Sequence, residues 1–231
     1  MKLKNNKELD ISIVMPCLNE EATVGQCVDE AFSFIRKYNL DGEVIVVDNG
    51  STDKSARIAD EHGARVISEE RRGYGRALRT GFEESRGNVV IMADCDTTYD
   101  LYNINGIYKL LTLGRYDMVI GDRFAGGIEK GAMPLSHKIG ARGLSLIARL
   151  RYKTKVRDFH CGLRGFTREA LTVMQFHTTG MEFATEIIAE AVRKNLRIGQ
   201  ISIKLRKSKA PRSSKLRTVR DGMRHLKYII H

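Results

Sequence analysis

The chain has 231 residues, of which 42% are hydrophobic and 29% charged, a composition that suits one large α/β domain, alone or with an appendage. Its four cysteines form no C-x-x-C pair and its N-terminus lacks an apolar leader, so neither a zinc site nor a disulfide framework is indicated, and a reducing cytosol is expected. The net charge of +11 lies in the last 39 residues, which hold 13 Lys or Arg and one acid.

The first half of the sequence predicts buried strands that alternate with helices. Apolar runs typical of strands lie at 11–15 (ended by Pro16), 43–47, 65–68 and 88–93, and helical patterns lie between them at 21–38, 51–62 and 75–85. Continuous apolar strands in this alternation indicate a mostly parallel sheet with helices on both faces. Ligands of such sheets bind beyond the carboxyl ends of the strands, where Asn19, Asp48 and Asp94 fall.

The second half predicts fewer and less regular elements. Strands are expected at 118–120 and 199–205, and amphipathic helices at 136–150 and 182–194. A final basic helix has one apolar stripe, formed by Leu216, Val219, Met223, Leu226 and Ile230. We therefore divide the chain into a main domain at residues 1–205 and a basic C-terminal segment at 206–231.

The pair Asp94 and Asp96 directly follows an apolar strand. Two carboxylates one residue apart can share a hard divalent cation, Mg²⁺ or Mn²⁺, that also binds a diphosphate. A solvated turn would also explain the sequence Asp94-Cys95-Asp96, because the pattern D-x-D occurs often by chance. The pair is a candidate metal site whose value depends on the motifs around it.

Six segments occur in an order that resembles the motifs of family-2 glycosyltransferases. They are PCLNE at 16–20, VVDNGSTD at 46–53, DCD at 94–96, GDRF at 121–124, DFHCGLRGF at 158–166 and RSSKL at 212–216. Within that family the chain is most similar to the dolichyl-phosphate mannose synthase group and its bacterial polyprenyl-phosphate relatives. The resemblance covers nearly everything from Ile11 to about Tyr228.

The resemblance implies a Rossmann-like GT-A fold, an inverting transfer from a nucleotide-sugar, and Mg²⁺ or Mn²⁺ at Asp94 and Asp96. By position, the residues that would contact the donor are Pro16, Asn19, Glu20, Asp48, Asn49 and Asp94. Amides and carboxylates at strand ends can hydrogen-bond a base edge and ribose hydroxyls, although a turn and a helix cap would also use them. The family usually has two acids where Asp48 and Asn49 stand, which leaves the preferred base open.

The segment Gly73-Tyr74-Gly75-Arg76 invites a dinucleotide-binding interpretation, which we reject. The G-x-G-x-x-G pattern fails because residue 78 is leucine, and the segment does not follow the first strand. Arg76 is instead a candidate contact for the donor, or a solvated arginine at a helix start.

One acidic residue, Asp158, and one basic residue, Arg164, flank the Cys-Gly turn of the fifth motif. Asp158 could hold metal, orient the acceptor or act as a base, or it could form only a loop-to-strand salt bridge, and Arg164 follows it. Gly180, Phe183 and Glu186 also match the family, although a helix with a buried Phe183 would explain the last two.

An acceptor phosphate monoester is already anionic at neutral pH, so it needs positioning more than a general base. The resemblance places its contacts at Arg123, Arg212, Ser214 and Lys215. The family often has a further arginine near His137, where Lys138 and Arg142 are candidates.

The basic tail favours partners that bear phosphate, such as lipid headgroups, a phosphorylated substrate or nucleic acid. Its final helix suits the surface of an anionic membrane, or it packs its apolar stripe on its own domain. Tyr228 is the only Phe, Trp or Tyr among the last 39 residues, so this segment offers few side chains on which bases could stack. No nucleic-acid partner is therefore expected.

We predict a metal-dependent hexosyltransferase that uses a UDP- or GDP-sugar and a polyprenyl (dolichyl-type) phosphate, peripheral at the cytoplasmic face of a membrane. Asp94, Asp96, Asp158 and Arg123 are the predicted catalytic residues. The alternatives are a soluble glycosyltransferase with a hydroxyl acceptor in polysaccharide or glycoconjugate synthesis, and a nucleic-acid-binding module. A nucleotidyltransferase would need a glycine-rich loop after the first strand, which PCLNE is not.

Overall fold

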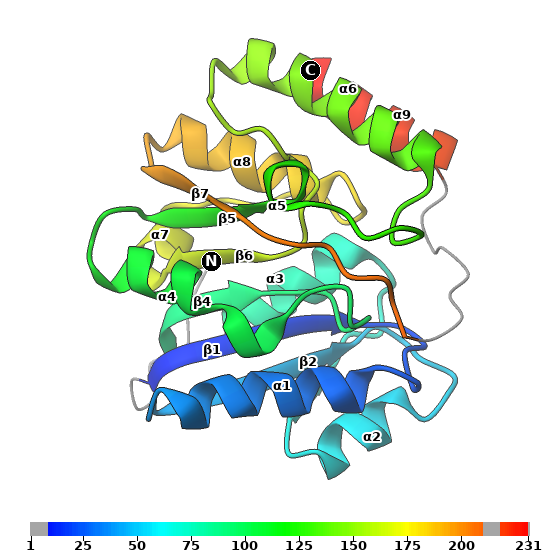
Figure 1. Cartoon of the computed structure of the whole chain (residues 1–231), viewed down its shortest axis with the longest axis vertical. Coiled ribbons are helices and arrows are strands. Elements are labelled where there is room, and N and C mark those ends of the chain that lie inside the picture. Colours follow the sequence, from blue (N-terminus) through cyan, green and yellow to red (C-terminus); the bar gives the residue numbers. More distant parts are fainter. Residues whose placement is uncertain (1–8, 210–217, 231) are drawn as a thin grey trace.

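A seven-stranded sheet runs through the part of the chain that the computed structural model describes, residues 9–209 and 218–230 (Figure 1). Its strands are β1 (Leu9–Cys17), β2 (Gly42–Asp48), β3 (Arg65–Ser68), β4 (Gly87–Met92), β5 (Met118–Asp122), β6 (Arg164–Thr167) and β7 (Ile198–Ser202). Their order in the sheet is β3-β2-β1-β4-β6-β5-β7. Only β6 runs antiparallel to its neighbours, so the mostly parallel sheet predicted from the sequence is confirmed.

Helices cover both faces of the sheet. They are α1 (Val24–Lys37), α2 (Ser55–Glu61), α3 (Tyr74–Glu84), the 3₁₀ turn η1 (Leu101–Asn103), α4 (Asn105–Thr112), α5 (Arg123–Gly126), α6 (Leu135–Tyr152), α7 (Arg168–Val173), α8 (Phe183–Arg193) and α9 (Thr218–Ile230). Alternate residues of β1 reach opposite faces: Ile11 meets Ile35 of α1 over Gly42, whereas Val14 fits against Gly81 of α3.

Aromatic contacts extend these two layers. Phe34 of α1 packs edge-on against Tyr108 of α4, and Phe82 of α3 lies 6.3 Å from Phe183 of α8 between ring centroids. The strands between the layers are almost fully buried, which is why they read as continuous apolar runs in the sequence.

Pro16 does not end the first strand, contrary to the sequence prediction. β1 continues to Cys17, and Pro16 pairs with Val47 of β2. The pairing of β1 with β4 has already ended at Val14 opposite Met92, so the missing N–H of Pro16 costs no bond to β4.

Neither β6 nor α4 was predicted from the sequence. β6 has four residues with a single large apolar side chain, Phe166, too little for a periodic signal. Its insertion between β4 and β5 brings the 158–164 segment to the carboxyl edge of β4, where Asp94 lies.

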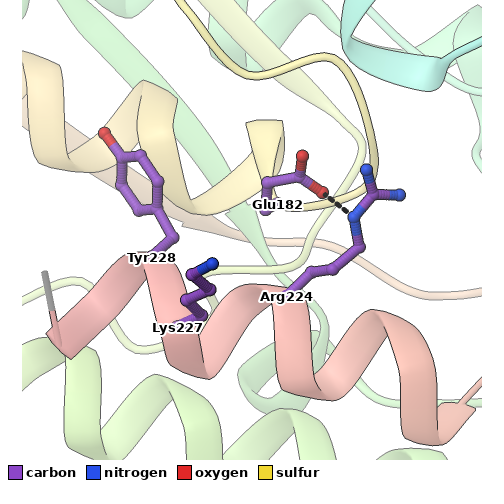
Figure 2. A pocket seen from close by; sticks show the side chains of 4 residues that line it. All are labelled: Glu182, Arg224, Lys227 and Tyr228. Atoms are coloured by element: carbon purple, nitrogen blue, oxygen red, sulfur yellow. Dashed lines mark ion pairs between the residues drawn. The ribbon is translucent and has the colours of Figure 1, made fainter.

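The helices α6 and α9 lie side by side at one end of the molecule, next to α8 (Figure 1). Only Ser145 and Ala148 are buried among the 18 residues of α6. The face of α9 that packs on the domain holds three buried side chains at four-residue spacing, Asp221, His225 and Ile229. Next to them, Arg224 of α9 forms an ion pair with Glu182 at the start of α8 (Figure 2).

The predicted apolar stripe of α9 is therefore not the face that packs on the domain. Met223 and Ile230 are 61% and 60% exposed and Leu226 is half-buried, whereas Leu216 and the side chain of Val219 lie outside the described residues. Helical periodicity alone does not say which face docks. In the described ranges, no helix is both long enough and apolar enough to span a membrane.

Acid is expected to destabilise the domain through His225. Burial lowers the pKa of His225 from 6.5 to about 4, with a smaller influence from the nearby charged groups Glu182, Asp221, Arg164 and Arg224. The unfolded chain therefore binds a proton between pH 6.5 and 4 that the folded chain does not, and His225 costs roughly 3 kcal/mol of stability across that window.

Urea unfolding at a series of pH values checks this prediction. Because His225→Gln cannot titrate, its stability should fall less steeply than that of the wild type between pH 6.5 and 4. Parallel curves for the two proteins would contradict it.

Candidate active site

The carboxyl ends of β1, β2 and β4 meet at one edge of the sheet. Cys17 is in register with Asp48, and the pairing of β1 with β4 ends shortly before Asp94. The structure thus brings Asn19, Asp48 and Asp94 to one edge, as the sequence predicted.

The loop after β1 is tied to the loop after β2 by reciprocal hydrogen bonds. The backbone N–H of Asn19 donates to Ser51 Oγ (2.9 Å), and Thr52 N–H donates to Asn19 Oδ1 (2.7 Å). Glu20 N–H donates to Ser55 Oγ (2.7 Å). Asp48 accepts the N–H of Ser51, as expected for a turn. These bonds set the positions of the predicted donor contacts Asn19, Glu20 and Asp48, and the pairing of Pro16 with Val47 sets that of Pro16.

Asn49, a predicted donor contact, also holds a neighbouring segment in place. It is buried, and its Nδ2 donates to the carbonyls of Glu69 (2.8 Å) and Arg71 (3.1 Å) while its Oδ1 accepts the N–H of Gly73 (2.7 Å). Asn49 therefore fastens the 69–73 segment to the end of β2. A carboxylate cannot donate to two carbonyls, which explains an amide at this position.

Asp94 and Asp96 follow β4 and differ in exposure. Asp94 is half-buried and its Oδ1 accepts the hydroxyl of Tyr74 (3.1 Å), whereas Asp96 is 3% exposed and its Oδ1 accepts the N–H (3.0 Å) and the hydroxyl (2.5 Å) of Thr98. The intervening Cys95 is buried, and its carbonyl accepts the hydroxyl of Thr23 (2.8 Å). The strand end is thus firmly held.

The donor set suits a hard divalent ion. Mg²⁺ is commonly held by one or two carboxylates, with the remaining ligands supplied by substrate phosphates and water. Within residues 9–209 and 218–230, no group of three His, Cys, Asp or Glu side chains could hold a metal ion. Asp94 and Asp96 are a pair of carboxylates of the kind that can hold such an ion together with substrate phosphates.

A buried ion pair joins Arg123 and Asp158. Arg123 Nε lies 2.7 Å from Asp158 Oδ2 and its terminal nitrogen 2.8 Å from Oδ1, and the backbone N–H of Arg123 also donates to Oδ2 (3.2 Å). Asp158 is fully buried and Arg123 is 7% exposed. The salt bridge considered for Asp158 therefore exists, and its partner is Arg123.

Arg164 has a different set of partners: its guanidinium donates to three backbone carbonyls. These belong to Phe159 (2.8 Å), Cys161 (2.9 Å) and Ala184 (2.7 Å). Arg164 is fully buried and fixes the 159–161 turn against the start of α8. Its place in the motif is explained by loop architecture.

Two residues near this turn escaped the sequence analysis. Tyr99 is buried and its hydroxyl accepts the N–H of Gly162 (2.8 Å). His160 donates its N–H to Asp158 Oδ1 (3.2 Å), and its ring lies 4.5 Å from that of His225. His160 lies inside the fifth motif and could have been noticed, whereas Tyr99 has no sequence signal.

The remaining candidates are spread around the same edge. Arg76, in the first turn of α3, has a buried Nε that makes no hydrogen bond. The described chain reaches Lys209, whose N–H donates to Thr97 Oγ1 (3.2 Å), next to Asp96. The predicted acceptor contacts that follow, Arg212, Ser214 and Lys215, lie outside the described residues.

Comparison with solved structures identifies the fold. The crystal structure of glucosyl-3-phosphoglycerate synthase from Mycobacterium tuberculosis with Mn²⁺, uridine-diphosphate and glucosyl-3-phosphoglycerate superimposes with a TM-score of 0.76, over 96% of this chain and 78% of that one, at 24% identity. The sheet, its helices and its loop-bearing carboxyl edge are those of the GT-A fold of glycosyltransferases.

The sequence then identifies the family. Residues 12–174 match the family described as glycosyl transferase family 2, and the chain belongs to it. It is 37% identical over 221 residues to the low-salt glycan biosynthesis hexosyltransferase Agl6 of Haloferax volcanii, which covers 95% of this chain. This chain spans only 53% of that relative. A dolichyl-phosphate hexose transferase of the same organism is 30% identical, over 85% of this chain and 83% of its own length.

The role of Asn49 can be tested with Asn49→Asp. A carboxylate would face two carbonyl oxygens that lose their donor, so we expect a loss of roughly 2 kcal/mol or more of stability and faster proteolysis near residues 69–73. Urea unfolding and limited proteolysis measure both effects.

Asn88→Asp, at an exposed position on β4, is the matched control and should change little. If both variants behave alike, the amide of Asn49 does not fasten the 69–73 segment.

Proposed function

We propose that this chain transfers a hexose from a UDP- or GDP-sugar to a polyprenyl phosphate, with inversion at the anomeric carbon. The observation that carries the proposal is the pair Asp94 and Asp96 at the end of β4, suited to an ion shared with a diphosphate. The relative named as a dolichyl-phosphate hexose transferase supports the choice of acceptor, because this chain spans 83% of it.

On the donor side, we infer that Pro16, Asn19, Glu20 and Asp48 face the nucleoside, since their loops lie at the edge where Asp94 and Asp96 stand. Asn49 supports this side by holding the 69–73 segment next to the end of β2. Arg76 is a candidate contact for the diphosphate. When bound at Asp94 and Asp96, Mg²⁺ or Mn²⁺ would neutralise the charge on the leaving diphosphate.

On the acceptor side, a phosphate oxygen attacks the anomeric carbon while the bond from that carbon to the nucleoside diphosphate breaks and its electrons stay with the diphosphate. The attacking oxygen is already ionised, so no side chain has to remove a proton. Arg123 is proposed to hold the acceptor phosphate together with Arg212, Ser214 and Lys215.

The state of Asp158 supports a phosphate acceptor over a hydroxyl. Its carboxylate accepts three hydrogen bonds from Arg123 and one from the N–H of His160. These donors engage both carboxylate oxygens of Asp158, which therefore sets the position of Arg123. A hydroxyl acceptor would need a general base, and Asp158 is already engaged with Arg123.

Asp96→Asn tests the metal site. The amide oxygen can still accept from Thr98, so the fold should persist, while transfer should fall by at least roughly 100-fold because one charged oxygen ligand is lost. The assay incubates UDP- and GDP-hexoses with a short-chain polyprenyl phosphate and Mn²⁺, with and without chelator, and scores product by mass spectrometry.

Asp60→Asn, an exposed acid on α2, is the control and should keep full activity. Wild-type turnover in Asp96→Asn, or turnover in the wild type that a chelator leaves unchanged, would sink the metal assignment.

We also propose that α6 and α9 rest on an anionic membrane at the cytoplasmic face. Five large apolar side chains of α6 are exposed: Leu135, Ile139, Leu146, Ile147 and Leu150. The helix contains no acid, and its basic residues are Lys138, Arg142, Arg149 and Arg151. With Met223, Lys227 and Ile230 of α9 beside it, this surface combines apolar area with positive charge, which complements anionic headgroups over an acyl layer.

Binding to sedimented vesicles of phosphatidylglycerol and phosphatidylethanolamine checks this surface. Ile139→Glu should weaken binding at least roughly tenfold, because an isoleucine side chain leaves the acyl region and an anion enters the headgroup layer. The control is Leu113→Glu, just after α4. Leu113 and Ile139 are almost equally exposed in the wild type, at 65% and 64%. Equal losses in both variants would contradict the assignment.

A further inference from the structure

The segment Gly73-Tyr74-Gly75 begins α3, and neither the dinucleotide interpretation nor the proposed function accounts for it. Tyr74 points its hydroxyl at the carboxylate of Asp94 and donates a hydrogen bond to Oδ1 over 3.1 Å. Asp94 belongs to β4, and Tyr74 lies on the helix that crosses from β3 to β4.

The two glycines allow this helix start to press against another segment. A Cβ on Gly73, whose φ is +149°, would lie 2.3 Å from the carbonyl oxygen of Thr179, and one on Gly75 would lie 2.8 Å from Phe183 Cβ. The N–H of Gly75 also donates to Thr179 O (3.1 Å). Because the backbone on both sides of Tyr74 is confined in this way, the position of the Tyr74 Cα and Cβ atoms is fixed.

Asn49 secures the same turn from the opposite direction. Its Oδ1 accepts the N–H of Gly73 over 2.7 Å. Tyr74 is therefore held through its own backbone neighbours by β2 and by the 178–183 segment, independently of Asp94.

Asp94 is confined on its second oxygen as well. A Cβ on Gly162 would lie 2.3 Å from Asp94 Oδ2, so only a glycine lets the turn approach so closely. The N–H of Gly162 donates to the hydroxyl of Tyr99 (2.8 Å), which holds that turn in place. The carboxylate thus has a hydrogen-bond donor at one oxygen and a backbone surface at the other.

We propose that Tyr74 is a positioning residue that fixes the orientation of the Asp94 carboxylate for a divalent ion, and that this is the purpose of the Gly-Tyr-Gly segment. The inference rests on the proposed metal site at Asp94 and Asp96. A ligand carboxylate that is hydrogen-bonded by a fixed donor loses less freedom when an ion binds, and removal of such outer partners typically costs roughly 10–100-fold in metal affinity or activity.

The test is Tyr74→Phe, which removes one oxygen and keeps the ring. Electron paramagnetic resonance of free Mn²⁺, titrated with protein in the presence of UDP, gives the dissociation constant. We expect it to rise roughly tenfold in the variant, with kcat restored toward wild type at saturating Mn²⁺. Restoration by excess metal separates a positioning defect from misfolding, which metal would not repair.

Tyr102→Phe serves as the control, because Tyr102 is exposed on η1, and it should bind Mn²⁺ as the wild type does. Asp94→Asn is measured in parallel. If it binds Mn²⁺·UDP and turns over like the wild type, the metal site itself is wrong. If Asp94→Asn loses both while Tyr74→Phe matches Tyr102→Phe, only the role of Tyr74 is overturned.

Discussion

The buried ion pair between Arg123 and Asp158 is the interaction on which the candidate site depends. It links the residue that follows β5 to the turn before β6, and so continues the contact that the backbone bond from Gly121 N–H to Leu163 O makes between the two strands. Removing one partner of such a pair leaves an uncompensated buried charge, at a cost of about 3–5 kcal/mol. The pair therefore fixes the turn that carries His160 and Gly162, and through Gly162 it limits where Asp94 can lie.

The two sides of the site are held by different kinds of bond. On the donor side, amide and hydroxyl groups such as those of Asn49 and Ser51 bind backbone atoms of neighbouring loops. On the acceptor side, charged groups are paired or satisfied by carbonyls, as in Asp158 and Arg164. The bonds on the donor side are thus neutral, whereas the pair on the other side is charge-assisted and holds the Arg123 guanidinium in a fixed position.

Much of the fold was predictable because the strands β1, β2 and β4 are buried on both faces and so appear as continuous apolar runs. Their shared direction also placed Asn19, Asp48 and Asp94 at one edge. β6 was missed because its four residues include one large apolar side chain, Phe166, and a buried arginine, Arg164, whose partner at Ala184 no local pattern encodes. For the same reason, helical periodicity could not reveal that α9 docks through Asp221 and His225, nor could the position of Asn49 reveal its carbonyl partners.

The close approach of Gly162 to Asp94 has a mechanical consequence. With a backbone surface against one oxygen and Tyr74 against the other, the carboxylate cannot swing without displacing the turn that Arg123 and Asp158 anchor. Binding at the proposed nucleotide edge and the geometry of the opposite half are thereby coupled through one steric contact. Any side chain larger than hydrogen at residue 162 would push against Asp94 and displace either the carboxylate or the turn.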